Sequence, residues 1–424
     1  MKKNILQDID NIKEKESVLN RYNLNEVLIG LTLFFLPISL KLNSICLILF
    51  FVYNLYLRIR FKTFFGIQFF IVGIVFFIIQ FLSFFLSENI DEAMKKLVLF
   101  LSFPVLAILF PKTEIQIDRI FRYLLYGVLI IMVYAFMRSA YEVIFLNVRF
   151  DYGRGPELLL KYTPHHAYLS LFIIISILVL TYQIGMNKIK SINVLIIPVL
   201  FLFLFILPSR TGLLIAFLIL PVFMFIFLNR KYSVRQLFVL LLALVVLSLI
   251  GLSIDFTKDK LLYAFYEFLN IPTEEKPFYG ITTRQKIWES CMYLIPRTPI
   301  LGFGIGDIQE VLNVQYHIQG YNEIININAH NQYLQNILQY GVILSSIIVA
   351  LFFMVIRKLA LRKEWLLFSI WTITLLFFAT ESMMNRQWGV VFCTILLTLS
   401  CYKLNLKKFE RFFNGKFAHK NINE

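Results

Sequence analysis

Long apolar segments alternate with short polar ones along nearly the whole chain. A helix needs roughly 17 to 25 apolar residues to cross a hydrocarbon core of about 30 Å. About twelve segments approach or reach that length. In order they are residues 24–40, 42–57, 64–86, 97–110, 120–146, 165–183, 191–207, 211–228, 236–254, 333–356, 364–380 and 388–405. The pattern predicts an all-α polytopic membrane protein, in which the short second and fourth segments could tilt or dip.

Composition indicates the same class. Hydrophobic residues make up 59% of the 424 residues, 45 residues are Phe, and the mean hydropathy is +0.73. These values exceed those of soluble globular domains. Four cysteines, mostly within apolar segments, suggest neither a disulfide framework nor a Cys-based metal site.

Lysine and arginine gather on one side of the predicted bundle. They occupy the tail 1–23, alternate connections between segments, and the basic tail 406–424. Because cytoplasmic loops carry the excess of basic residues, we expect both termini to be cytoplasmic. The net charge of +15 then reflects topology and anionic lipid head groups, so we expect a lipid bilayer and no nucleic acid as partner.

Residues 255–332 form one long connection between the first nine segments, at 24–254, and the last three, at 333–405. The topology places this connection outside the cytoplasm. Its first part, residues 258–269, has the pattern of an amphipathic helix on the membrane surface. Residues 299–306 carry three glycines, and a turn is favoured over a nucleotide-binding loop because no strand–loop–helix unit surrounds them.

Polar residues at the borders of apolar segments fall on the same outer face. They are His165, His166, Arg210, His330, Glu381 and Arg386, and Arg284 lies on the same side within the long outer connection. Charges near membrane depth are costly, so their gathering at one level indicates a shared, water-accessible cavity for anionic ligands.

Each of these residues also has a purely structural interpretation. The arginines at 210 and 284 could reach lipid head groups or solvent, and His330 could cap a helix. His165 and His166 could simply begin a span. Glu381 and Arg386 could form a local ion pair, or Glu381 could assist a neighbouring base.

Four motifs follow one another in the last half of the chain. They are Ser209-Arg210-Thr211-Gly212, Arg284 with Trp288, Pro299 followed by Gly302-Phe303-Gly304, and Ala329-His330-Asn331 with Gly341 further along. Their order and membrane placement resemble the O-antigen ligase and O-antigen polymerase superfamily of bacterial integral-membrane glycosyltransferases. The related region spans roughly residues 195–350.

The resemblance implies an enzyme of the bacterial inner membrane with its active site on the periplasmic face. It would move a glycan from undecaprenyl diphosphate to an acceptor hydroxyl, with no metal or soluble cofactor. Arg210 and Arg284 would hold the diphosphate and His330 would act as general base, with inversion at the anomeric carbon. His165, His166, Glu381 and Arg386 are secondary candidates.

Two activities share this donor chemistry. A ligase passes the chain to a lipid A-core sugar, whereas a polymerase extends the growing glycan on its carrier. The compact loop with Arg284 and the Ala-His-Asn motif favour the ligase, and relatives that glycosylate proteins or build other surface polysaccharides remain alternatives. A multi-span transporter or flippase is less favoured, because the sequence shows no convincing internal repeat and its polar residues gather toward one face.

Overall fold

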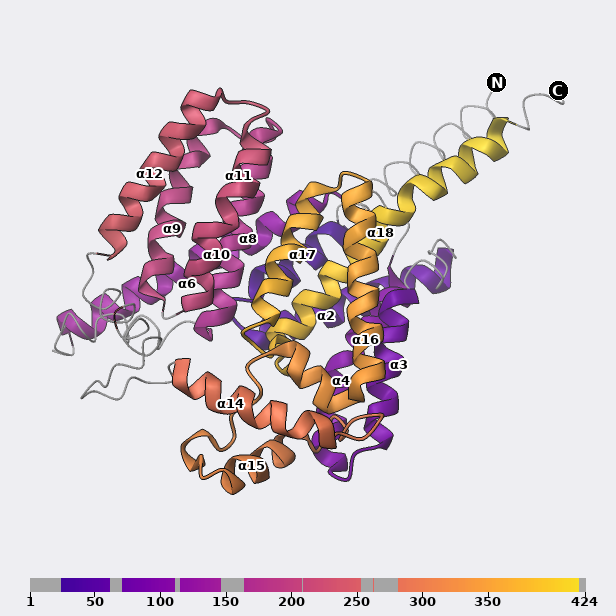
Figure 1. Ribbon diagram of the computed structural model, residues 1–424. Helices are drawn as coiled ribbons and strands as arrows, with labels where there is room; N and C mark the ends of the chain where they lie inside the picture. Colours follow the sequence, from indigo (N-terminus) through magenta and orange to yellow (C-terminus); the bar gives the residue numbers. More distant parts are fainter. Residues whose placement is uncertain are drawn as a thin grey trace.

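The computed structural model describes residues 24–61, 71–110, 115–145, 164–207, 209–252 and 281–418, together with Leu262. All regular elements of these residues are helical (Figure 1). After an apolar helix at Leu24–Phe35, the α-helices are α2 (Leu40–Phe61), α3 (Ile71–Phe85), α4 (Ile90–Phe100), α5 (Ser102–Leu109), α6 (Ile117–Phe145), α8 (His166–Gly185), α9 (Ile196–Ile206), α10 (Arg210–Leu218), α11 (Leu220–Leu228), α12 (Val234–Leu252), α14 (Ile281–Leu294), α15 (Ile308–Ile318), α16 (Gln332–Leu361), α17 (Trp365–Phe378) and α18 (Gln387–Ala418). Short 3-10 turns are η2 (Ser191–Leu195), η3 (Ile295–Arg297), η4 (Asn322–Ile324) and η5 (Met383–Asn385).

Six helices of the described residues are long and apolar enough to cross a membrane. They are Leu40–Arg60, Ile117–Phe145, His166–Gly185, Arg210–Leu228, Gln332–Leu361 and Gln387–Asn405. The predicted all-α, multi-span class is confirmed, and the count of about twelve spans is not. Several other apolar helices are short: α3, with 15 residues, is about 22 Å long at about 1.5 Å per residue.

Two predicted segments differ in detail from the helices that the structure contains. The second segment lies within α2, which has 22 residues and is among the six long helices. The fourth is divided at Leu101 into α4 and α5, so it does not form one straight span. Residues 1–23 and the predicted amphipathic helix at 258–269, apart from Leu262, lie outside the described residues.

Helix α8 lies at the centre of the bundle. Of the residues in its most apolar 18-residue stretch, 94% are buried. Helices α6, α9, α10, α11 and α17 pack around it. A helix that is apolar on all sides is expected in such a position. The first residue of α8, His166, lines a common cavity with Thr283 and Arg284 of α14, so the start of α8 lies at the end of the bundle next to α14.

Residues 281–331 fold as a small helical unit at that end of the bundle (Figure 1). Helices α14 and α15 enclose a core of their own, which includes Ile287, Cys291, Leu312 and Tyr316. Burial raises the pKa of the Cys291 thiol to about 12, so this thiol is protonated and packs as an apolar group. The partly helical character predicted for the long loop is confirmed over these residues.

Residues 299–306, which carry three glycines, form a turn against a break in α16. Gly341 has a φ of 72° inside that helix, which leaves the carbonyls of the preceding turn without their usual donors. Phe303 N donates to Leu338 O at 2.9 Å, and Gly304 N donates to Gln339 O at 3.2 Å. The turn therefore supplies backbone hydrogen bonds to the broken helix, which agrees with the turn predicted from the sequence.

Replacing Gly341 with alanine should lower the melting temperature and the yield of folded protein. A Cβ at this position would lie 2.0 Å from Ile300 O, and the observed φ and ψ of 72° and 170° lie in a region that costs a non-glycine residue about 1–3 kcal/mol. Gly320→Ala is the matched control, because Gly320 also has a positive φ but a Cβ added there would meet nothing within 4 Å. Thermal unfolding in detergent measures both. Equal losses in the two variants would show that close packing of the turn is unimportant.

Candidate functional site

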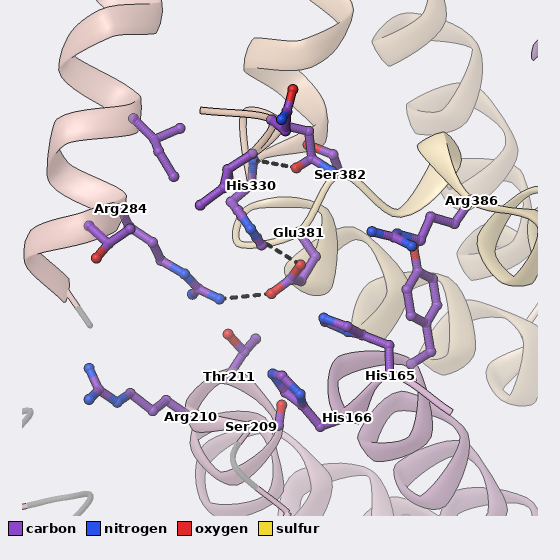
Figure 2. Close-up of a pocket in the computed structure, with 16 residues that line it drawn as sticks. His165, His166, Ser209, Arg210, Thr211, Arg284, His330, Glu381, Ser382 and Arg386 are labelled. Atoms are coloured by element: carbon purple, nitrogen blue, oxygen red, sulfur yellow. Dashed lines mark hydrogen bonds and ion pairs between the residues drawn. The ribbon is translucent and has the colours of Figure 1, made fainter. Parts of the chain in front are cut away.

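A cavity of about 280 Å³ lies where the 281–331 unit meets the ends of α8, α10 and α17 (Figure 2). Its lining includes all seven residues singled out from the sequence: His165, His166, Arg210, Arg284, His330, Glu381 and Arg386. The chain thus brings together side chains that are up to 221 positions apart, from His165 to Arg386. Ser382, Asn328 and Tyr168, which the sequence did not single out, also line the cavity.

The Ser-Arg-Thr-Gly motif places Arg210 at the first turn of α10. Ser209 caps that helix, since its hydroxyl accepts a hydrogen bond from Gly212 N. Thr211 donates to the Thr380 hydroxyl at 2.8 Å, which joins α10 to the segment that carries Glu381. Gly212 lets α8 approach closely, because a Cβ there would lie 2.7 Å from Ser170 Cβ. Each residue of the motif therefore helps to fix Arg210 at the cavity.

His330 occupies a strained position just before α16. Its φ is 42°, in the left-handed region that side chains other than glycine seldom adopt. Its amide donates to Asn328 Oδ1 at 3.0 Å, and the next residue, Asn331, caps α16 by accepting from Tyr333 N and Leu334 N. Asn331 N also donates to Ser382 Oγ at 3.2 Å. These bonds stabilise a conformation that projects the imidazole into the cavity.

Helix α14 presents two motif residues on one face. Arg284 and Trp288 are four positions apart, so they point to the same side of the helix. Trp288 Nε1 donates to Ala329 O at 3.2 Å, directly before His330. The spacing of the Arg284 and Trp288 motif therefore has a structural explanation: one side chain lines the cavity and the other fixes the backbone of the histidine.

Glu381 joins Arg284 to His330. Its Oε1 accepts from Arg284 at 2.7 Å, and its Oε2 lies 3.0 Å from His330 Nδ1 (Figure 2). The Glu381 side chain is 9% exposed, against 29% for Arg284 and 26% for His330. The expected local pair between Glu381 and Arg386 is wrong, because both carboxylate oxygens face partners from distant parts of the chain.

The charge state of Glu381 decides which nitrogen of His330 carries a proton. Burial by itself raises the pKa of Glu381, but the hydrogen bond with His330 and the positive charges of protonated His330 and of Arg284 hold it below its ordinary value of 4.5. An ionised carboxylate only accepts hydrogen bonds, so Nδ1 of His330 must donate. In the neutral ring Nε2 then has a free lone pair, and it can take a proton from a hydroxyl group.

His165 and His166 begin α8 on another side of the cavity. Their rings stack with centroids 4.3 Å apart. Burial, more than any charge, lowers the pKa of His165, so this ring is neutral near pH 7. It can therefore exchange hydrogen bonds with hydroxyl groups but adds no charge to the cavity.

Among the described residues, no three His, Cys, Asp or Glu side chains gather in a way that would hold a metal ion. The cavity instead combines three guanidinium groups, one carboxylate and three imidazoles. Guanidinium groups bind phosphate oxygens in a bidentate manner, and an imidazole oriented by a carboxylate can accept a proton. This combination suits transfer of a group from a phosphate ester to a hydroxyl.

Comparison with known proteins agrees with the geometry. Residues 194–349 match the sequence profile of the O-antigen ligase family. The match contains Arg210, Arg284 and His330 and ends before Glu381 and Arg386. No curated protein sequence matches the chain. This match supports membership of the chain in the O-antigen ligase and polymerase superfamily.

Proposed function

We propose that the chain transfers an oligo- or polysaccharide from undecaprenyl diphosphate to a sugar hydroxyl, with the lipid A-core as acceptor. The contact of His330 with the ionised Glu381, in a cavity that Arg210 and Arg284 also line, is the observation that supports this function best. The reaction takes place at the periplasmic face of the bacterial inner membrane, with both termini in the cytoplasm. It needs no metal or soluble cofactor.

The first step is binding of the lipid-linked donor through its diphosphate. Arg210 and Arg284 bind the phosphate oxygens and hold the negative charge that grows as the leaving group departs. Arg284 gives one nitrogen to Glu381, and the other N–H groups of its fork remain for phosphate. Because Glu381 also fixes this guanidinium, Arg284 needs little rearrangement when the donor binds.

The second step is attack by the acceptor hydroxyl. His330 Nε2 takes the hydroxyl proton while the oxygen bonds to the anomeric carbon and the bond from that carbon to the diphosphate oxygen breaks. The products are the glycosylated acceptor and undecaprenyl diphosphate, with inversion at the anomeric carbon. Glu381 stabilises the imidazolium that forms, and this proton is later released to water.

The test is transfer by the purified full chain in lipid nanodiscs. An undecaprenyl-diphosphate-linked oligosaccharide is supplied with a lipid A-core acceptor, and the products and free undecaprenyl diphosphate are measured. Glycan on the core supports the ligase. Longer glycan on the carrier instead would identify a polymerase that uses the same donor. Neither product, with the donor intact, would contradict glycosyl transfer. Movement of intact donor across the bilayer of closed proteoliposomes would then indicate a transporter.

A further inference from the structure

Arg386 is a positively charged residue of the cavity that has no role in the proposed mechanism. It lies between η5 and α18, is exposed, and lines the cavity. Within the described ranges, no carboxylate pairs with its guanidinium. Glu381 is the one acidic residue in the described lining, and its two oxygens already face Arg284 and His330. The positive charge of Arg386 therefore faces the cavity.

The position of Arg386 separates it from the other two arginines. Figure 2 shows Arg210 and Arg284 on one side of the Glu381 carboxylate, and Arg386 with His165 on the other. A diphosphate bound by the first two arginines would thus leave Arg386 free. This arrangement divides the cavity into two regions of positive charge.

His165 adds a second recognition group beside Arg386. Its Nδ1 is buried and has no hydrogen-bond partner among the described residues. Such a nitrogen is costly to leave unpaired, so a turn of the ring that brings it to a bound hydroxyl would be favourable. A guanidinium next to a neutral imidazole suits a sugar that carries both an acidic group and hydroxyls.

The backbone around Arg386 is tightly held. Gly389 N and Val390 N both donate to Arg386 O at 3.1 Å, and Tyr168 Oη donates to Met383 O at 3.0 Å. A Cβ on Gly389 would lie 2.0 Å from Met383 O, so the turn permits only glycine there. The base of the Arg386 side chain is therefore positioned before any ligand binds.

The geometry of the reaction indicates which substrate meets this region. In a direct displacement the incoming oxygen and the leaving oxygen lie on opposite sides of the anomeric carbon. With the diphosphate at Arg210 and Arg284, the acceptor approaches from the opposite side. We propose that Arg386 and His165 form an acceptor subsite that binds an acidic sugar, through its carboxylate or phosphate group; this inference rests on the proposed function.

The test compares Arg386→Gln with the wild-type chain in nanodiscs. Two acceptor glycans are used, one with a phosphate or uronate group and one with that group removed or reduced. Loss of one charge-assisted contact should raise the KM for the acidic acceptor roughly 10- to 100-fold and leave the donor KM unchanged. The preference of the wild type for the acidic acceptor should disappear. Arg297→Gln is the matched control, since Arg297 is an exposed arginine stacked on Tyr293 outside the cavity.

A binding measurement separates failure of the subsite from failure of the proposed function. Saturation-transfer NMR with methyl glucuronide and methyl glucoside needs no turnover. Selective binding of the glucuronide that Arg386→Gln abolishes would support the subsite even if the chain transfers no glycan. A raised donor KM with an unchanged acceptor KM would assign Arg386 to the donor instead. Glucuronide binding that is unchanged in the variant would overturn the subsite.

Discussion

Replacing His330 with alanine should reduce glycan transfer by about 10²- to 10⁴-fold, the range expected for loss of a positioned general base. Among the described residues that line the cavity, the His330 imidazole is the one group that is both held by an ionised carboxylate and able to present a free lone pair. Without it the acceptor hydroxyl would have to lose its proton to water. Initial rates of undecaprenyl diphosphate release in nanodiscs measure the effect.

Two further variants make the His330 result interpretable. Asparagine tolerates the positive φ of this position, so His330→Asn removes the base with less backbone strain than alanine. His317→Ala is the control, because His317 is an exposed histidine on α15 outside the cavity lining. We expect His317→Ala to match the wild type. Wild-type rates in His330→Asn, at normal protein levels, would remove the histidine from the mechanism.

The fold class could be predicted because membrane thickness fixes the length of an apolar span. The number of spans could not be predicted as reliably, because it depends on where a helix ends within an apolar run. The fourth predicted segment shows this: nothing in its hydrophobicity marks Leu101, where α4 stops and α5 begins. Helix α3 is as apolar as a span, but its described part, Ile71–Phe85, has 15 residues.

The sequence predicted which residues line the cavity better than it predicted their partners. Polar residues at the borders of apolar segments gather at one level because charge is costly in lipid. Pairing depends instead on how distant segments pack. Arg284 is 97 positions from Glu381, and His330 is 51 positions from it. Sequence proximity suggested Arg386 as the partner of Glu381, and this was wrong because the turn at η5 directs the two side chains apart.

The sequence contains Trp288 as a motif residue but does not explain its role. Its spacing from Arg284 was part of the family motif, yet its role depends on a hydrogen bond to Ala329, 41 positions away. Gly341 is similar, since only the structure shows that its positive φ frees carbonyls for the glycine turn. In both cases the motif residue positions the backbone of a neighbouring segment.

Replacing Glu381 with glutamine should reduce transfer by about 10²-fold, near the lower end of the range for acid–base catalysis. The amide oxygen would accept from Arg284, so the amide NH2 would face His330 Nδ1. Nδ1 would then have to accept that hydrogen bond, and the ring proton would move to Nε2. The base would be present but in the wrong tautomer. Glu381→Asp keeps the charge and should retain more activity than the glutamine variant.

The same substitution should change how stability depends on pH. The pKa of Glu381 is below 4.5 in the folded chain, so the stability contributed by its ionised form is fully present above the unfolded pKa and is lost as pH falls through the folded pKa. Wild-type and Glu381→Gln melting temperatures should therefore differ most above the unfolded pKa of Glu381, and they should converge as pH falls below 4.5 and through the folded pKa. Glu289→Gln, on α14 but outside the cavity lining, is the control. If the difference between wild type and Glu381→Gln stays constant across this range, the ionised Glu381 does not hold the histidine and arginine together, and the tautomer argument loses its basis.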